Sequence, residues 1–159
     1  MSVLSLFTEE TIFNPLKVRS KKQLLVKLSD LAAVKTGLKS SDIFQALIDR
    51  EKLGSTALGH GVAIPHLSVK DCPSVSVFLA ILDKPISFDA IDGQPIDVVV
   101  FLLAPEDKNG LHLRTMSKIS RLLRDEDFCL RLRGAGDPAA TLAVLFDREE
   151  QNKSFKLRA

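Results

Sequence analysis

The chain has 159 residues, 45% of them apolar, which is enough for one domain with a buried core. Its formal net charge is only +2 and it contains neither Trp nor Tyr, which argues against nucleic-acid binding by charge or base stacking. The two cysteines, Cys72 and Cys129, form no CxxC pair, as is typical of reduced thiols in a cytosolic protein. The N-terminal segment MSVLSLFTEE lacks a basic region, and the longest apolar run, residues 98–104, falls short of the ~20 residues of a membrane helix, so we expect a cytoplasmic protein.

Two helices are predicted in the first third of the chain. Ser20 can cap a helix in which leucines recur at three- and four-residue intervals, and Gly37 closes it. A second helix begins at Ser40 or Ser41 and stops at Gly54, with its apolar side chains on one face.

Four extended segments are predicted. Residues 11–16 form a short extended stretch, residues 62–64 a brief apolar strand, and residues 75–82 a longer strand that ends where Lys84-Pro85 turns the chain. Residues 96–103 are almost wholly apolar, which is typical of a strand buried on both faces. Together with the helices, this pattern predicts a single α/β domain over residues 1–159. Its mixed sheet would have about four or five strands, with helices on both faces.

The last third of the chain is predicted to be helical. A loop over residues 106–110 leads to a helix whose inward side chains are Leu113, Met116, Ile119, Leu122 and Leu123. Residues 125–132 predict a short helix, and Asp137-Pro138 begins a final one, with Asp as cap and Pro as first helical residue. The chain becomes polar from Arg148, so residues 148–159 are expected to fray.

The segment from Gly54 to His66, GSTALGHGVAIPH, is the part of the sequence with the clearest chemical character. Glycines on both sides of His60 suit a tight turn with positive φ angles. Pro65 fixes its own φ and favours an extended residue before it, so His66 is expected at the end of a stiff strand, where pairing stops. An imidazole held in this way has little conformational freedom to lose on meeting a partner, although an ordinary surface histidine fits the pattern too.

Residues 50–56 (REKLGST) and 59–66 (GHGVAIPH) are similar to the active-site signature of the enzyme IIA family of the bacterial phosphotransferase system. The resemblance is to the mannitol/fructose type and, within it, to the nitrogen-related branch. It extends over nearly the whole chain through three further segments: FDAID (88–92), PID (95–97) and HL (112–113). Two positions depart from the family pattern, because His60 stands where Asn is frequent and Leu67 stands where Gly is commoner.

The resemblance implies that His66 accepts a phosphoryl group from an HPr-type phosphohistidine protein, with His112 and Arg50 as further site residues. With an ordinary pKa near ~6.5, His66 would be mostly neutral, and therefore nucleophilic, at cytosolic pH. The transition state of phosphoryl transfer is loose, so the other groups mainly position the phosphoryl oxygens and neutralise their charge. A forked guanidinium and the start of a helix both suit those oxygens. The backbone of the turn could also bind them, at Gly59, His60 and Gly61.

These observations lead to the hypothesis of a phosphotransferase-type carrier that is phosphorylated stoichiometrically and acts on regulatory target proteins. No metal or cofactor is expected, because the histidines lack ligand spacing and the chain has no nucleotide-binding fingerprint or nucleophile elbow. The sequence shows no appended IIB, IIC or HPr-like segment, which favours the regulatory branch. Two alternatives stay open: a sugar-specific enzyme IIA of the fructose/mannitol type that passes phosphate to a IIB domain, and a non-catalytic protein-binding regulator in which His66 is vestigial.

Apolar residues beside His66 suggest how a partner protein would dock. Val62, Ile64 and Leu67 are expected to form an apolar rim around the imidazole, with Arg50 nearby, as at the centre of many interfaces. A phosphoryl group would place close to two negative charges within that rim. The phosphorylated and free forms are therefore expected to bind different partners.

Overall fold

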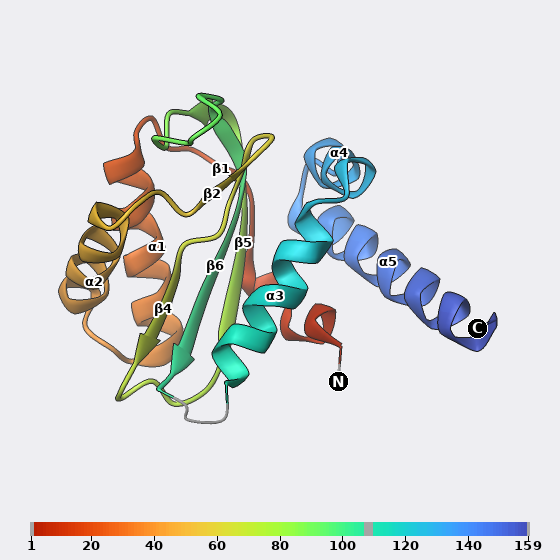
Figure 1. Cartoon of the computed structure of the whole chain (residues 1–159), viewed down its shortest axis with the longest axis horizontal. Helices are drawn as coiled ribbons and strands as arrows, with labels where there is room; N and C mark the ends of the chain where they lie inside the picture. Colours follow the sequence, from red (N-terminus) through yellow and green to blue (C-terminus); the bar gives the residue numbers. More distant parts are fainter. Residues whose placement is uncertain (1, 107–109, 159) are drawn as a thin grey trace.

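The computed structural model in Figure 1 describes residues 2–106 and 110–158, and shows a mixed sheet between two groups of helices. The strands follow across the sheet in the order β1 (Ile12–Leu16), β5 (Ser76–Ile86), β6 (Ile96–Pro105), β3 (Val62–Ala63) and β2 (Ala57–Gly59), and β4 (His66–Val69) also pairs with β6. Strand β6 is antiparallel to β5 and parallel to β3 and β4. The predicted α/β class and mixed sheet are confirmed, with six strands in the sheet.

Helices cover both faces of the sheet, as predicted (Figure 1). On one face lie α1 (Lys21–Thr36) and α2 (Ser40–Lys52), and on the other lie α3 (Leu111–Leu123), α4 (Glu126–Gly134) and α5 (Pro138–Arg158). Two short 3-10 helices, η1 (Val3–Leu6) and η2 (Glu9–Thr11), precede β1. Among the described residues, no helix is both long enough and apolar enough to cross a membrane.

The helix ends mostly follow the predicted capping signals. Ser20 Oγ accepts a backbone N–H in the first turn of α1, and Gly37 closes this helix in the left-handed region, with φ 79°. Asp137 caps α5 by accepting the N–H of Ala140 at 2.7 Å. Ser40 is the first residue of α2 but does not cap it, because its hydroxyl donates to the Asp30 carboxylate in α1 instead.

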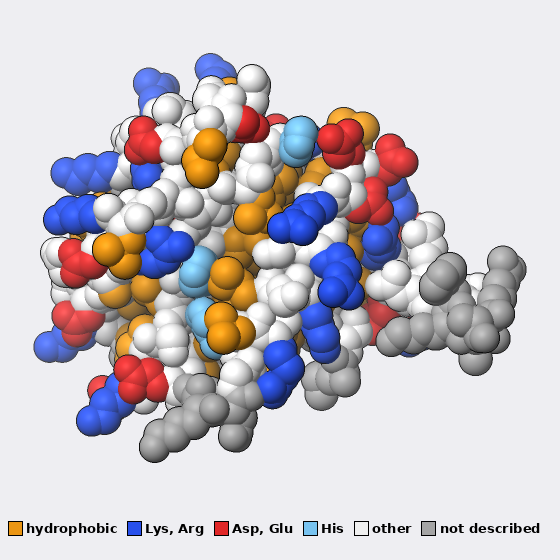
Figure 2. Space-filling view, viewed as in Figure 1, with side chains coloured by type: hydrophobic (Ala, Val, Ile, Leu, Met, Phe, Trp, Pro, Cys, Tyr) orange, Lys and Arg blue, Asp and Glu red, His pale blue; other side chains and the backbone are white. Residues whose placement is uncertain are grey.

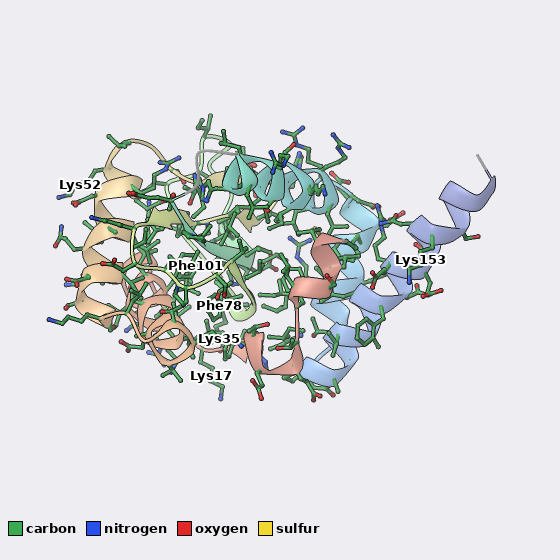
Figure 3. All side chains as sticks on the ribbon, turned by 90° about the horizontal axis from the view of Figure 1, so that it is seen from below. Lys17, Lys35, Lys52, Phe78, Phe101 and Lys153 are labelled. Atoms are coloured by element: carbon green, nitrogen blue, oxygen red, sulfur yellow. The ribbon has the colours of Figure 1, made fainter. Side chains whose placement is uncertain are left out.

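The central strands are buried on both faces, in agreement with the apolar run of residues 96–103. Under α1 and α2, the rings of Phe78 and Phe101 stack with their centroids 5.8 Å apart, and Figure 3 shows both in the interior while the labelled lysines lie at the surface. Leu79, which follows Phe78, and Val100, which precedes Phe101, belong to a second cluster of buried residues, under α3, α4 and α5. Since successive side chains of a strand point to opposite faces, β5 and β6 supply both clusters at once.

Strand β5 is longer than the sequence suggested. The prediction that Lys84-Pro85 turns the chain is wrong, because β5 continues to Ile86, which pairs with Ile96. The register between β5 and β6 shifts between Ile81 and Ile86. Pro lacks an N–H and removes one ladder bond, so it is tolerated in this irregular stretch.

One helical prediction is wrong, one stays untested, and one predicted loop falls largely outside the described residues. Leu113 does not point inward; its side chain is 70% exposed, and the buried residues of α3 are Thr115, Ile119, Leu122 and Leu123. Helix α5 extends to Arg158, and the expectation that residues 148–159 fray stays a prediction. The predicted loop over residues 106–110 falls largely outside the described residues, since 107–109 are not described.

Candidate functional site

His66 is the first residue of β4, and the central strand β6 fixes its backbone. The Pro65 carbonyl accepts the N–H of Leu102 at 3.0 Å, and His66 lies opposite Leu102 in the parallel pair of β4 and β6. The prediction that pairing stops at His66 is therefore wrong, because pairing with β6 resumes there. Pro65 lacks a donor but keeps its acceptor, so the short break between β3 and β4 leaves little backbone freedom beside the imidazole.

The ring of His66 is oriented by a backbone carbonyl. Its Nδ1 lies 2.8 Å from the Ile64 oxygen, and because a carbonyl only accepts, the proton is on Nδ1 and the lone pair on Nε2. Burial lowers the pKa of His66 from its ordinary 6.5; the Ile64 hydrogen bond raises this pKa, the Arg50 charge lowers it and the Glu51 charge raises it. With burial as the largest of these effects, the ring is neutral at neutral pH and presents a bare Nε2, which is the form a nucleophile requires.

His112, in the first turn of α3, places a second imidazole beside His66. The two ring centroids are 5.6 Å apart, at an angle of 49°. Nδ1 of His112 is buried and has no hydrogen-bond partner among the described residues. Buried N–H groups without an acceptor are rarer than buried acceptors without a donor, so this environment favours the proton on Nε2. Burial and the neighbouring His66 both lower the pKa of His112, which makes it a neutral donor.

Arg50 lies in the last turn of α2, as predicted, and its positive charge acts on His66. Its Nη1 donates to the Gly54 carbonyl at 2.9 Å, which fixes one end of the guanidinium and leaves further N–H donors for a ligand. Figure 2 shows histidine side chains among apolar ones on this face, with Lys and Arg on either side. His66, His112 and Arg50 thus come together from three different elements.

The turn between β2 and β3 lies away from this group, contrary to the proposed role of Gly59, His60 and Gly61 in binding phosphate. Val62, just after the turn, pairs with Val98, whereas His66 pairs with Leu102. Four residues along β6 correspond to roughly 13 Å, too far for the turn to contact a phosphoryl group on His66. The N–H of His60 also already donates to the Asp92 carboxylate at 3.0 Å, so an acidic group occupies the place predicted for an anion.

The positive φ angles predicted for this turn are present. His60 has φ 55°, and the flanking glycines have φ 97° and 81°. Arg133 holds the turn from α4, since its Nη2 donates to the His60 carbonyl at 3.1 Å and its Nε to Asp97 at 2.9 Å. The glycine pattern therefore reflects turn geometry.

No group of three His, Cys, Asp or Glu side chains in the described part of the chain is placed to hold a metal ion.

The apolar rim predicted around His66 is not formed by the residues expected to form it. Val62, Ile64 and Leu67 are buried in the core, because they belong to the strands themselves. Two exposed apolar side chains instead follow site residues in the sequence: Leu53, 84% exposed, comes three residues after Arg50, and Leu113 comes directly after His112. Both lie at helix ends rather than in the strands, at the end of α2 and the start of α3.

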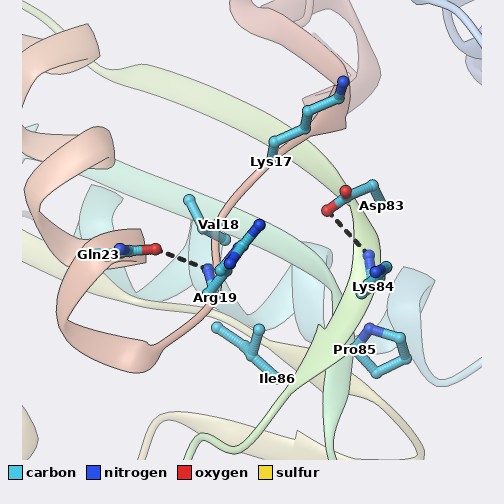
Figure 4. A pocket seen from close by; sticks show the side chains of 8 residues that line it. All are labelled: Lys17, Val18, Arg19, Gln23, Asp83, Lys84, Pro85 and Ile86. Atoms are coloured by element: carbon cyan, nitrogen blue, oxygen red, sulfur yellow. Dashed lines mark hydrogen bonds between the residues drawn. The ribbon is translucent and has the colours of Figure 1, made fainter.

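A separate pocket of about 520 Å³ lies between the start of α1 and the end of β5 (Figure 4). Its polar contacts are local, from the Arg19 N–H to Gln23 Oε1 and from the Lys84 N–H to Asp83 Oδ1. No histidine lines it. Ile86 at its edge is nine residues along β5 from Val77, and Val77 pairs with Leu102, the residue that lies opposite His66. We therefore do not place the phosphoryl site there.

Sequence analysis assigned no role to Glu51, yet Glu51 is the most buried acid near His66. Its side chain is only 5% exposed and lies 3.0 Å from Lys21 Nζ. Thr56, also overlooked, donates its hydroxyl to Glu51 at 2.7 Å. An available signal was the acidic residue in the last turn of a predicted helix, where it opposes the helix dipole.

Comparisons with known proteins show the family of this chain. The family model described as "Phosphoenolpyruvate-dependent sugar phosphotransferase system, EIIA 2" matches residues 5–147. A nitrogen regulatory protein of Bradyrhizobium diazoefficiens is 45% identical over 145 residues, covering 91% of this chain and 95% of the relative. The nitrogen regulatory protein of Escherichia coli K12 is 37% identical over 151 residues, covering 94% and 92%.

Solved structures show the same relationship. The crystal structure of nitrogen regulatory protein IIA-Ntr from Neisseria meningitidis superposes with a TM-score of 0.84 at 31% identity, covering 90% of this chain and 98% of that one. The mannitol IIA of Escherichia coli shares the fold, with a TM-score of 0.73 at 24% identity, covering 87% and 98%. From the family match and these relatives, the chain belongs to the type 2 EIIA family of the phosphotransferase system, in its nitrogen regulatory branch.

Proposed function

We propose that the chain is a phosphoryl carrier of a nitrogen-related phosphotransferase system, phosphorylated on Nε2 of His66 by an HPr-type phosphohistidine protein. The observation that carries the proposal is the 2.8 Å contact between His66 Nδ1 and the Ile64 carbonyl, which leaves Nε2 as the nucleophilic nitrogen. Such a carrier works in the cytoplasm, where phosphoenolpyruvate and the donor are found. It is a stoichiometric intermediate, since each His66 holds one phosphoryl group until an acceptor takes it.

The transfer needs no proton to move. The lone pair of His66 Nε2 forms the new N–P bond as the P–N bond of the donor phosphohistidine breaks, and the donor imidazole leaves with that electron pair. The His66 ring becomes positive while its proton stays on Nδ1, where the Ile64 carbonyl at 2.8 Å stabilises it. The Ile64 carbonyl, which accepts the Nδ1–H hydrogen bond, therefore stabilises both the neutral nucleophile and the charged product.

Two neighbouring groups suit the oxygens of the transferred phosphoryl group. Arg50 offers guanidinium donors that the Gly54 contact leaves unused, and its permanent charge offsets the charge of the loose transition state. His112 offers Nε2–H from a ring whose centroid is 5.6 Å from that of His66. Neither group is a base poised to activate water against phosphorus, which is consistent with a phosphohistidine that survives until it reaches an acceptor.

The relatives support a regulatory role. Those named nitrogen regulatory proteins in Bradyrhizobium diazoefficiens and Escherichia coli match 95% and 92% of their own lengths, at 45% and 37% identity. By contrast, a Bacillus subtilis fructose-specific EIIABC component is 25% identical, and the match covers only 23% of it. We infer that the phosphorylation state of His66 controls which target proteins the chain binds.

Intact-protein mass spectrometry tests the proposal. The chain is incubated with phosphoenolpyruvate, enzyme I and an HPr-type donor, and the expected result is the mass of one acid-labile phosphoryl group on the wild type and none on His66→Ala. His60→Asn is the matched control and should be phosphorylated like the wild type. A His66→Ala protein that still gains one phosphoryl group, or a wild type that gains none, would contradict the proposal.

The sugar-specific alternative predicts a different second step. A solved complex joins the mannitol IIA with its phosphorylated IIB enzyme, and that IIA shares this fold at 23% identity with a TM-score of 0.75. If the phosphorylated chain discharges rapidly and completely to a purified fructose- or mannitol-type IIB domain, transport rather than regulation is its function. We expect slow or incomplete transfer to such a domain.

A further inference from the structure

Glu51 is an acid in a position that is electrostatically unfavourable. It lies in the last turn of α2, where the helix dipole is negative, and its side chain is 5% exposed. Lys21 supplies the opposite charge, with Nζ 3.0 Å from Glu51 Oε1. The other hydrogen bonds of this buried carboxylate come from Thr56, the residue that it positions.

Those contacts run from Glu51 to the ring of His66. The Thr56 hydroxyl donates to Glu51 Oε2 at 2.7 Å, and the Thr56 N–H donates to Oε1 at 3.3 Å. The Thr56 carbonyl accepts the N–H of Ile64 at 3.0 Å. The Ile64 carbonyl accepts Nδ1–H of His66 at 2.8 Å. Each link is a hydrogen bond, and both intermediate residues are buried.

The other end of the same connection is the FDAID segment, residues 88–92. Lys21 Nζ is 3.3 Å from the Asp89 carboxylate and 4.5 Å from the centre of the Phe88 ring. Ser55, beside Thr56, donates its hydroxyl to the Phe88 carbonyl at 2.8 Å. The segment therefore holds the loop that precedes β2 in place through Ser55 and Lys21, without being part of the site itself.

We propose that Glu51 is a positioning residue for phosphoryl transfer: paired with Lys21, it fixes Thr56 and, through the Ile64 carbonyl, the ring orientation and tautomer of His66. The inference rests on the proposed function and extends it to a group that touches neither donor nor phosphoryl group. In-line transfer depends on where Nε2 lies, and a misplacement of about 1 Å can slow an enzymatic step on the order of 100-fold.

Electrostatics alone would give Glu51 a smaller role. Its charge raises the pKa of His66, but it is the last of four effects on that pKa, and Lys21 neutralises it at 3.0 Å. The Arg50 charge acts in the opposite direction. The geometric connection through Thr56 is therefore the larger expected contribution.

Four variants separate positioning from charge and from stability. Thr56→Val removes the hydroxyl at nearly constant size, and Thr56→Ser restores it. Glu51→Ala removes the carboxylate, and Asp49→Ala is its matched control, because Asp49 is an exposed acid of the same helix that contacts Gln45. Phosphorylation is measured at increasing concentrations of the HPr-type donor, together with the ¹⁵N NMR signals of the His66 ring.

Thr56→Val and Glu51→Ala should lower the rate at saturating donor roughly 10- to 100-fold and leave the half-saturating donor concentration within about twofold. Their ring signals should show a mixture of Nδ1–H and Nε2–H forms where the wild type shows Nδ1–H. Thr56→Ser and Asp49→Ala should match the wild type in both measurements.

Wild-type ring signals in Thr56→Val and Glu51→Ala would overturn the proposal, whether or not the rate or the melting temperature fell, since Glu51 would then only stabilise the fold. If Glu51→Ala does not fold, Thr56→Val decides alone. If the wild type takes up no phosphoryl group, the proposed function fails, but the ring signals still show whether Glu51 and Thr56 fix the tautomer.

Discussion

His66 and His112 lie with their ring centroids 5.6 Å apart, and their surroundings favour protons on different ring nitrogens. His66 is protonated at Nδ1 by its bond to the Ile64 carbonyl, whereas the buried, unpartnered Nδ1 of His112 favours a proton on Nε2. One ring is thus prepared to attack phosphorus and the other to donate to an oxygen. Two chemically identical side chains acquire complementary roles from their surroundings.

Replacing His112 should slow phosphorylation without abolishing it. His112→Ala removes one donor to the phosphoryl oxygens and leaves the nucleophile, so we expect a rate lower by a factor on the order of ten to a thousand. The measurement is the rate of mass gain at saturating HPr-type donor. A His112→Ala rate equal to that of the wild type would mean that His112 has only a structural role.

Arg50→Lys tests the forked geometry of the guanidinium at constant charge. Losing one charge-assisted hydrogen bond, worth about 1.5 kcal/mol, should lower the phosphorylation rate on the order of tenfold. Arg124→Lys is the matched control, since Arg124 is an exposed arginine at the end of α3. If both variants react at the same rate, Arg50 does not bind the phosphoryl oxygens.

His60→Asn should have almost no effect, because the turn between β2 and β3 lies away from His66. Asn tolerates the left-handed φ of 55° and keeps the backbone N–H that donates to Asp92. We expect a free energy of unfolding within about 0.5 kcal/mol of the wild type in urea titrations. The phosphorylation rate should be unchanged, and a marked loss of rate would return this turn to the site.

The fold should lose stability as the solution becomes mildly acidic. Burial lowers the pKa of both His66 and His112 below 6.5, whereas in the unfolded chain both titrate at the ordinary value. Below pH ~6.5 the unfolded state therefore binds more protons than the folded state. The free energy of unfolding that the neutral imidazoles contribute is complete above that pH, and it declines as the pH falls through the lowered pKa values. Urea unfolding from pH 7.5 to 5.5 measures this decline in the free energy of unfolding, which should be smaller in His112→Gln. An equal decline in wild type and His112→Gln would show that protonation of His112 does not contribute to it.

The sequence predicted the fold better than it predicted the surroundings of the candidate site. Apolar periodicity and caps such as Ser20 and Asp137 act locally, so the helices could be read directly. The connection from Glu51 through Thr56 to His66 joins residues up to fifteen positions apart, and only the folded chain brings them together. The backbone of the Gly59–Gly61 turn could in principle bind phosphoryl oxygens, but the pairing with β6 separates this turn from His66.

The identity of the phosphorylated nitrogen tests the account most directly. The chain is labelled with ¹⁵N-histidine, phosphorylated by phosphoenolpyruvate, enzyme I and an HPr-type donor, and examined by NMR for the ring nitrogen bonded to phosphorus. The contact between His66 Nδ1 and the Ile64 carbonyl predicts phosphate on Nε2 of His66, with Nδ1 still protonated. Phosphate on Nδ1 of His66, or on either nitrogen of His112, would contradict it.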